Sequence, residues 1–216
     1  MTTAPKRSIL TGSRSGRDLI VIATTMLLGS CLLSGCLSRP SLVKQSFTLS
    51  CPTMTSSAAT TTNRVLAIKR LMIAAPFDDQ SLVYRTGEFS YERDPYAEFL
   101  VPPAETLAVA ICGYFRDSGV FNAVTEPGSA FKPDILVEIS IDQLYGDFRG
   151  RADATAVLAM RFIFFDASAG MPGKVLLQKG SSRHIHVKAR NAASLVEGWN
   201  EGLKQVLDEM SANLKL

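Results

Sequence analysis

The chain contains very few of the residues and motifs on which common catalytic chemistry depends. It has only two histidines in 216 residues, and it has no Gly-rich phosphate loop, no Gly-x-Ser-x-Gly elbow and no His-Glu-x-x-His motif. His184 and His186 would share one face of a strand and could both bind a metal, but no cysteine or carboxylate cluster nearby supplies the further ligands that zinc needs. A hydrolase that uses either histidine as a base stays open, although no activated nucleophile is paired with them in sequence. The sequence therefore predicts no catalytic residue, no metal site, no cofactor and no enzymatic activity.

An excess of positive charge is also missing from most of the chain. The protein has 23 Lys and Arg residues against 20 Asp and Glu residues, a formal net charge of +3. Four of the basic residues and one acidic residue precede Cys36, which leaves 19 of each sign in the remainder. Because nucleic-acid binding depends on cations that replace phosphate counterions, a neutral body argues against a nucleic-acid partner.

What the first 35 residues do contain is the pattern of a lipoprotein signal peptide. Basic residues are followed by fifteen uncharged residues, LIVIATTMLLGSCLL, and then by Ser34, Gly35 and Cys36. Basic, apolar and small-residue regions in this order are typical of a secretory leader, and the apolar run is short for a transmembrane helix. The tetrapeptide LSGC that ends at Cys36 resembles the bacterial lipobox, in which cleavage precedes a cysteine that becomes acylated.

We therefore expect residues 1–35 to be removed and Cys36 to carry the lipid. Two or more acyl chains would then anchor the body to a membrane that it does not span. Cys31, at the end of the similar tetrapeptide LGSC, is a rival lipidation site, and a buried or disulfide-bonded Cys36 is a further alternative. Residues 36–63 include a Ser, Thr and Ala-rich run and are expected to form a flexible tether.

The chain from residue 64 to 216 predicts a single α/β domain, in which two amphipathic helices pack on a mixed, mostly antiparallel sheet. Alternating or continuously apolar segments indicate the strands. These are residues 46–50 at an edge, 65–77, 81–93 as a hairpin that turns at Thr86 and Gly87, 120–124, 135–142, 155–165, and 174–189 with a break near Gly180. The 155–165 segment is apolar at nearly every position, so we expect a central strand with both faces covered.

The two helices are indicated by apolar residues that recur every three or four positions. The first is expected to begin near Ala104 and to end at Gly119, which suits a left-handed cap. The second is expected to begin near Ala192, because Ser194 and Glu197 have the spacing of a capping box.

Two further cysteines, Cys51 and Cys112, lie outside the leader. An oxidising compartment would permit a disulfide between them. Cys112 belongs to the apolar face of the first predicted helix, so a buried thiol is the role that we expect for it, and the pairing stays open.

Aromatic residues gather in and after the predicted hairpin. They are Tyr84, Phe89, Tyr91, Tyr96 and Phe99, and such rings either fill a core or form a recognition surface. Acidic residues of this segment are interleaved with arginines, as in a solvated mixed-charge surface. Arg85 could contact a partner, or it could form a structural ion pair with Glu88 or Glu92.

The stretch SLVYRTGEFSYERDPYAEFLVPPAETLAVAICGYFRDSGVFNAV resembles the ABC-type transport auxiliary lipoprotein family, whose members accompany MCE-type intermembrane lipid transport systems. The likeness extends from about Phe47 to Ala212. It rests on the triplet Val83-Tyr84-Arg85, the following Tyr91, the helix after Pro103, the step from Ser118 to Val124, and Phe47-Thr48-Leu49 upstream. The family often has a Trp shortly after the second Tyr, where this chain has Tyr96 and Phe99.

The resemblance implies a non-catalytic lipoprotein, anchored in the outer membrane with its body in the periplasm. Its partners would be an MCE-family protein and an inner-membrane ABC transporter that together move phospholipids or other apolar compounds across the cell envelope, and the lipoprotein could also form a homo-oligomer. Leu37 follows Cys36 in place of the Asp that retains lipoproteins in the inner membrane. Tyr84, Arg85 and Tyr91 are the residues that we expect to contribute to a protein or lipid contact. A lipoprotein of outer-membrane (lipopolysaccharide) assembly is the main alternative.

Overall fold

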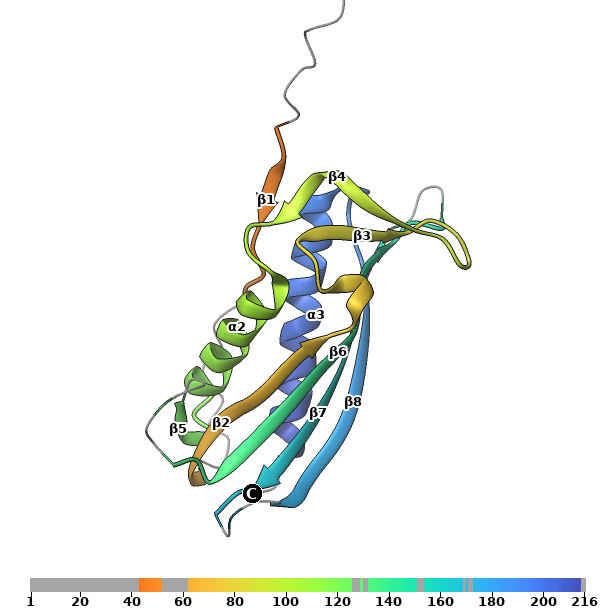
Figure 1. Cartoon of the computed structure of the whole chain (residues 1–216). Coiled ribbons are helices and arrows are strands. Elements are labelled where there is room, and N and C mark those ends of the chain that lie inside the picture. The colour runs from red at the N-terminus through yellow and green to blue at the C-terminus, as the bar shows by residue number, and fades with distance from the viewer. Residues whose placement is uncertain are drawn as a thin grey trace, which may run out of the picture. The chain divides into compact units, whose positions relative to one another are not determined.

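Eight strands form one mixed sheet, and two long helices pack on one of its faces (Figure 1). The computed structural model describes residues 43–51, 62–125, 129, 132–150, 154–168, 170 and 173–214, so the predictions for the leader, Cys31 and Cys36 lie outside the described residues. The elements are β1 (Gln45–Phe47), β2 (Thr62–Ile73), a 3-10 turn η1 (Ala75–Phe77), β3 (Ser81–Arg85), β4 (Tyr91–Phe99), α2 (Pro103–Asp117), β5 (Phe121–Thr125), β6 (Ile135–Asp147), β7 (Thr155–Asp166), β8 (Lys174–His186) and α3 (Ala192–Asn213).

Strand β6 organises the sheet because it is bordered by three other strands. One edge of β6 pairs antiparallel with β7 along its whole length, and β7 pairs antiparallel with β8. The other edge of β6 pairs in parallel first with β2 and then, at Gly146 and Asp147, with β3. β5 extends the sheet beyond β2, while β4 and β1 extend it beyond β3. The longest pairings are antiparallel, and the predicted fold class, an α/β domain with a mixed sheet and two helices, is confirmed.

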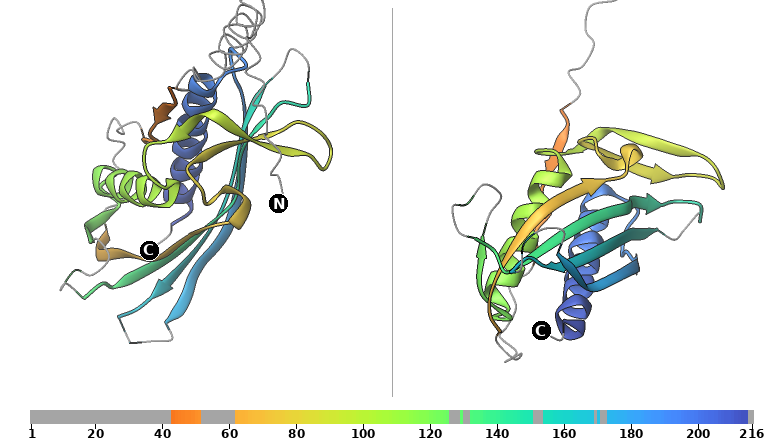
Figure 2. Two further views of the ribbon diagram at one scale, coloured as in Figure 1. Left: turned by 45° about the horizontal axis from the view of Figure 1, so that its top comes forward. Right: turned by 60° about the horizontal axis from the view of Figure 1, so that its bottom comes forward.

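The core lies between the sheet and the two helices (Figure 2). Alternate residues of β6, namely Ile135, Val137, Ile139 and Ile141, are buried, as their period of two predicts. On the same side of the sheet Phe115 of α2 packs edge-on against Phe164 of β7, with 6.3 Å between ring centroids. The only tryptophan, Trp199 of α3, is also buried there and donates a hydrogen bond from Nε1 to the carbonyl of Tyr145.

The expectation that both faces of the 155–165 strand are covered is wrong for most of β7. The strand is interior, and its inward residues Met160, Phe162 and Phe164 are buried. On the outward face Arg161 is exposed and forms an ion pair with Asp142, with a distance of 2.6 Å between Nε and Oδ2. Because both helices lie on the inward face, the outward side chains of Ala159, Ile163 and Phe165 remain partly in contact with solvent, whereas Val157 is buried.

Several element boundaries differ from the sequence prediction for local reasons. β2 ends at Ile73, before the turn that contains Pro76, and β8 continues through Gly180 without a break. Helix α3 is capped by Asn191, whose side chain accepts a hydrogen bond from the backbone N–H of Ser194 at 2.8 Å. The left-handed residue after α2 is Gly119, with φ +66°, as expected.

The chain joins the domain earlier than the predicted tether, residues 36–63, would suggest. β1 pairs in parallel with β4, and Leu49 is buried in the core. The backbone N–H of Ser50 donates to the side chain of Asn200 on α3 at 3.0 Å. Residues 43–51 are therefore held by the sheet and by a helix.

Neither of the two cysteines in the described residues forms a disulfide. Cys112 is buried in α2, as expected from the apolar face of that helix. Cys51 is half-buried, and burial raises the pKa of its thiol to about 11. In the structure neither residue is part of the disulfide that the sequence left open.

Candidate interaction surface

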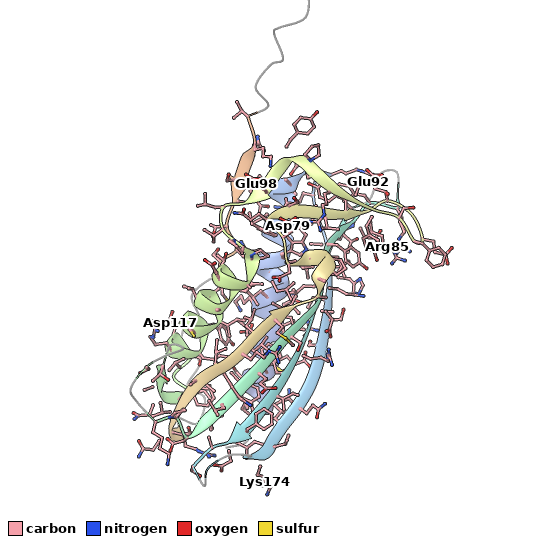
Figure 3. All side chains as sticks on the ribbon, viewed as in Figure 1. Asp79, Arg85, Glu92, Glu98, Asp117 and Lys174 are labelled. Carbon is pink, nitrogen blue, oxygen red and sulfur yellow. The ribbon has the colours of Figure 1, made fainter. Side chains whose placement is uncertain are left out.

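The β3–β4 hairpin carries all three residues that the sequence singled out for a contact. Its two strands pair antiparallel with Tyr84 opposite Glu92 and Arg85 opposite Tyr91. β3 pairs with β6 only at its last two residues, Tyr84 and Arg85. The turn that follows them extends away from the rest of the sheet, as Figure 3 shows around Arg85 and Glu92.

Tyr84 fixes the base of the hairpin on the domain. Its ring stacks on Phe148 with 4.6 Å between centroids, and its hydroxyl donates a hydrogen bond to a carboxylate oxygen of Asp94. Burial, and then this hydrogen bond, raise the pKa of Tyr84 well above its usual range. A Cβ added to Gly146 of β6 would stand 3.2 Å from the Tyr84 ring. The absence of a side chain at Gly146 therefore leaves room for the ring. Tyr84 therefore acts as a structural support in the hairpin.

Arg85 holds the turn of the hairpin closed. Its Nε donates to the carbonyl oxygen of Gly87 at 3.3 Å, and its Nη2 donates to that of Glu88 at 2.7 Å. The guanidinium carbon also lies 5.8 Å from the centre of the Tyr91 ring, within the range of a cation–π interaction. Among the described residues Arg85 bonds to backbone carbonyls and does not form the ion pair with Glu88 or Glu92 that the sequence left open, while its contact with a partner stays a prediction.

Tyr91 belongs to an aromatic cluster on the sheet face opposite the helices. Its ring meets Tyr145 edge-on at 5.6 Å and Phe77 of η1 at 6.4 Å, and Phe77 in turn stacks on Tyr145 at 5.8 Å. Tyr145 and Phe77 are buried, whereas Tyr91 keeps about half of its surface, 47%, in solvent. The cluster thus presents one supported aromatic ring to the outside.

The five aromatic residues that lie close together in the sequence differ in how far they are buried in the structure. Phe99 is in the core and Tyr84 is half-buried, while Tyr91, Tyr96 and Phe89 are exposed. Phe89 lies in the turn between β3 and β4 and is 88% exposed, the largest value among the exposed large hydrophobic residues described. An exposed aromatic ring in a turn that Arg85 holds in one shape is a candidate for a contact with a partner.

Phe77 and Tyr145 were not singled out by the sequence, because each lies in a different element from Tyr91. The periodicity of β6 makes Tyr145 a strand residue, but only the pairing of β6 with β3 brings it next to the hairpin. We call Arg85, Phe89 and Tyr91 the hairpin face.

The two histidines lie on β8, with His184 opposite Val157 and His186 opposite Thr155, and both are exposed. His184 Nε2 is 3.3 Å from the hydroxyl of Ser182. Among the described residues no group of three His, Cys, Asp or Glu side chains could hold a metal ion. A solvated strand face is therefore the interpretation that the geometry favours for both.

A hollow of about 400 Å³ opens on the outer face of the sheet, lined by Glu138, Ser140, Arg161, Ile163, Gln178, Lys179 and Gly180. Its charged side chains are engaged: Arg161 pairs with Asp142, Lys179 with Glu209, and Glu138 with Lys69. Because the charged side chains that line the hollow already form ion pairs within the domain, the hairpin is the stronger candidate site. Separately, neither helix in the described part of the chain is long and apolar enough to cross a membrane.

Comparison with solved structures identifies proteins of the same fold. The chain is similar to protein XCC0632 from Xanthomonas campestris, with 16% identity and a TM-score of 0.62 over 79% of this chain and 91% of that one. It is also similar to an uncharacterized protein, with 14% identity and a TM-score of 0.61 over 80% of this chain and 99% of that one. No curated protein matches the sequence. At these identities the solved structures support the fold alone.

The family comparison is more specific than the structural one. The model of the ABC-type transport auxiliary lipoprotein component matches residues 47–211, from the last residue of β1 to the last turn of α3. That segment includes the hairpin, both helices and all of the sheet except the start of β1. Because the match spans well over half of the 216 residues, the chain belongs to the ABC-type transport auxiliary lipoprotein component family.

Proposed function

We propose that this protein is a membrane-anchored, non-catalytic accessory subunit of an ABC transporter of the MCE type. In this role it assists the movement of phospholipids or other apolar compounds across the cell envelope. The observation that carries the proposal is the family match over residues 47–211 in a chain whose leader ends in a lipobox. The energy for transport would come from the transporter's ATP-hydrolysing subunit, so the accessory subunit needs a contact surface and an anchor.

The anchor in this proposal is an acylated Cys36. A thioether-linked diacylglycerol and an amide-linked acyl chain together make membrane attachment stable, since one chain alone binds only reversibly. Leu37 at the next position supports sorting to the outer membrane, with the folded body in the periplasm. Mass spectrometry of protein extracted from membranes should find the acyl groups on Cys36, whereas acylated Cys31 would move the site to the rival tetrapeptide.

The hairpin face is the contact surface that we propose for the MCE-family partner. Phe89 and Tyr91 supply apolar and aromatic area, which binding sites concentrate in a few residues. Arg85 keeps the turn in one shape, so less conformational entropy is lost when a partner binds. Tyr84 acts indirectly, because its stacking on Phe148 and its bond to Asp94 set the direction of the hairpin.

Co-purification from detergent-solubilised envelopes tests both the partner and the surface. We expect the tagged protein to recover the MCE-family and transporter subunits. The variant Phe89→Ser should lower that recovery several-fold, because truncating an anchor residue removes a large part of binding energy. Val109→Ser is the matched control, since Val109 is an exposed apolar residue of α2 outside the hairpin. Absence of these subunits from the wild-type sample would refute the proposed partners, and equal recovery with Phe89→Ser would refute the surface.

A further inference from the structure

A second group of exposed apolar residues lies along the sheet edge where the chain joins the domain. It consists of Tyr96, Leu100 and Val101 on the β4 side and of Val43 before β1, of which Val43 and Leu100 are 85% and 64% exposed. We call these four residues the anchor-side edge. They come from the chain before β1, from β4 and from the link between β4 and α2, on the sheet edge marked by Glu98 in Figure 3.

Backbone pairing holds the anchor-side edge in a fixed shape. Residues of β1 lie beside residues of β4, with Gln45 opposite Ala97 and Phe47 opposite Phe99. The N–H of Leu100 donates to the carbonyl of Phe47 at 2.7 Å, and the carbonyl of Leu100 accepts from Gln80 Nε2 at 3.0 Å.

An ion pair further ties the incoming chain to this edge. Lys44 Nζ lies 2.6 Å from a carboxylate oxygen of Glu98. The apolar side chains therefore stand on an ordered strand pair, and their exposure is a property of the folded domain.

The length of chain before Val43 restricts what this edge can meet. Seven peptide steps separate Cys36 from Val43, and a fully extended chain of that length spans at most about 25 Å. A tether that continued to Asn63 would have allowed roughly 95 Å. Since β1 is part of the sheet, a lipid on Cys36 keeps the anchor-side edge close to the bilayer surface at all times.

The opposite end of the sheet is under no such restriction. Lys174, at the start of β8, marks that end in Figure 3, and a strand of the length of β8 extends about 40 Å. The two ends of the domain therefore differ in how near the short tether holds them to lipid.

We infer that the anchor-side edge docks on the bilayer that holds the acyl chains. The inference rests on the proposed acylation of Cys36. Leu100, Val43 and Val101 have the aliphatic side chains that enter the boundary between headgroups and acyl chains, and Tyr96 has the amphipathic ring that is enriched at that depth. Docking would hold the body in one orientation on the membrane and would leave the far end of the sheet directed away from it.

Fluorescence of introduced tryptophans can test this docking on the full acylated protein. The natural Trp199 is buried and provides a constant background. Leu100→Trp and Tyr96→Trp place reporters on the anchor-side edge at exposed positions, where the fold should tolerate them. Val175→Trp is the matched control, because Val175 is a 48% exposed aliphatic residue next to Lys174 at the far end.

The variants are reconstituted into phosphatidylethanolamine and phosphatidylglycerol vesicles, with and without bromine atoms on the acyl chains. We expect brominated lipid to quench the added emission of Leu100→Trp and Tyr96→Trp, which should also move to shorter wavelength, and to leave that of Val175→Trp unchanged. If brominated lipid quenched the added emission of both edge reporters no more than that of Val175→Trp, the docking would be overturned. A shift to shorter wavelength without quenching, as a protein partner or a second copy would cause, would overturn it as well.

Flotation of the same samples separates this inference from the proposed anchor. Protein that floats with the vesicles but shows no quenching at the edge keeps its anchor and lacks the docking. Wild-type protein that fails to float has no lipid anchor, and that result would overturn the proposed anchor and the docking together.

Discussion

Replacing Gly198 by alanine should destabilise the domain, although alanine is the better helix former. At Gly198 helix α3 packs closely against the sheet. A Cβ at this position would stand 2.7 Å from the Cβ of Ala156 and 2.8 Å from Cγ1 of Val187. The Cβ of Ala156 is bonded to the backbone and cannot rotate away, and Val187 is a buried, β-branched residue whose χ1 angle has little freedom to move Cγ1. Helix and strand would have to separate by about 1 Å to restore ordinary carbon–carbon contact.

The net effect of Gly198→Ala is the difference between two terms. Alanine gains about 1 kcal/mol of helix propensity over glycine. Overpacking of a filled core costs about 1–3 kcal/mol, and the separation would also loosen Trp199, so we expect a net loss of about 1–2 kcal/mol. Gly113 of α2 supplies the control, because nothing lies within 4 Å of its added Cβ. There the propensity term acts alone, and Gly113→Ala should stabilise by about 1 kcal/mol or less.

Urea unfolding followed by the emission of the single Trp199 measures both variants. The midpoint for Gly198→Ala should fall by roughly 0.5–1 M, while that for Gly113→Ala should stay or rise. If Gly198→Ala unfolded at the same urea concentration as Gly113→Ala, the close approach of α3 to the sheet would be incorrect.

Three further predictions concern polar contacts. The Glu209 carboxylate on α3 accepts hydrogen bonds from three side chains of β8, which lower its pKa from 4.5 to about 2. Its contribution to the free energy of unfolding is therefore complete above pH 4.5 and is lost as the pH falls toward 2. Glu209→Gln should cost about 1–2 kcal/mol at neutral pH in urea unfolding, and the difference from the wild type should shrink over that acidic range. Asn191→Ala should cost about 1 kcal/mol by loss of the α3 cap, measured by thermal unfolding, whereas Ser194→Ala should have little effect. Tyr84→Phe keeps the ring but loses the bond to Asp94, so we expect a loss of about 1 kcal/mol in urea unfolding; an unchanged midpoint would contradict that bond.

The helices and most strands could be predicted from the sequence because their signals are local. The stripe of α2 and the alternation in β6 are repeats of a few residues, and the structure places both elements within a few residues of the prediction at their starts. The interior position of β7 also follows from its apolar run. The face of β7 that stays open could not be predicted, since it depends on where two distant helices pack.

In the hairpin, too, local sequence patterns predicted some features and tertiary contacts decided the others. Its position, its turn and its aromatic residues were evident from residues 81–93, and the family resemblance pointed to Tyr84, Arg85 and Tyr91. Their separate tasks were not evident, because Tyr84 meets Phe148 and Tyr91 meets Tyr145 only after β6 has paired with β3. Contacts between residues more than fifty positions apart leave no periodic trace in a single sequence.

The sequence by itself determined the family resemblance, the lipobox that ends at Cys36, the neutral body and the class of fold, because each depends on residue types at short spacing. The alternation of residues 46–50 predicted an edge strand, but only the tertiary structure decided that β1 pairs with β4, which leaves seven peptide steps between Cys36 and Val43. The physical reason is that a three-residue strand has no stability of its own. β1 is ordered by its hydrogen bonds to β4, by the ion pair of Lys44 with Glu98, and by the burial of Leu49 and the bond of Ser50 to Asn200 that follow it.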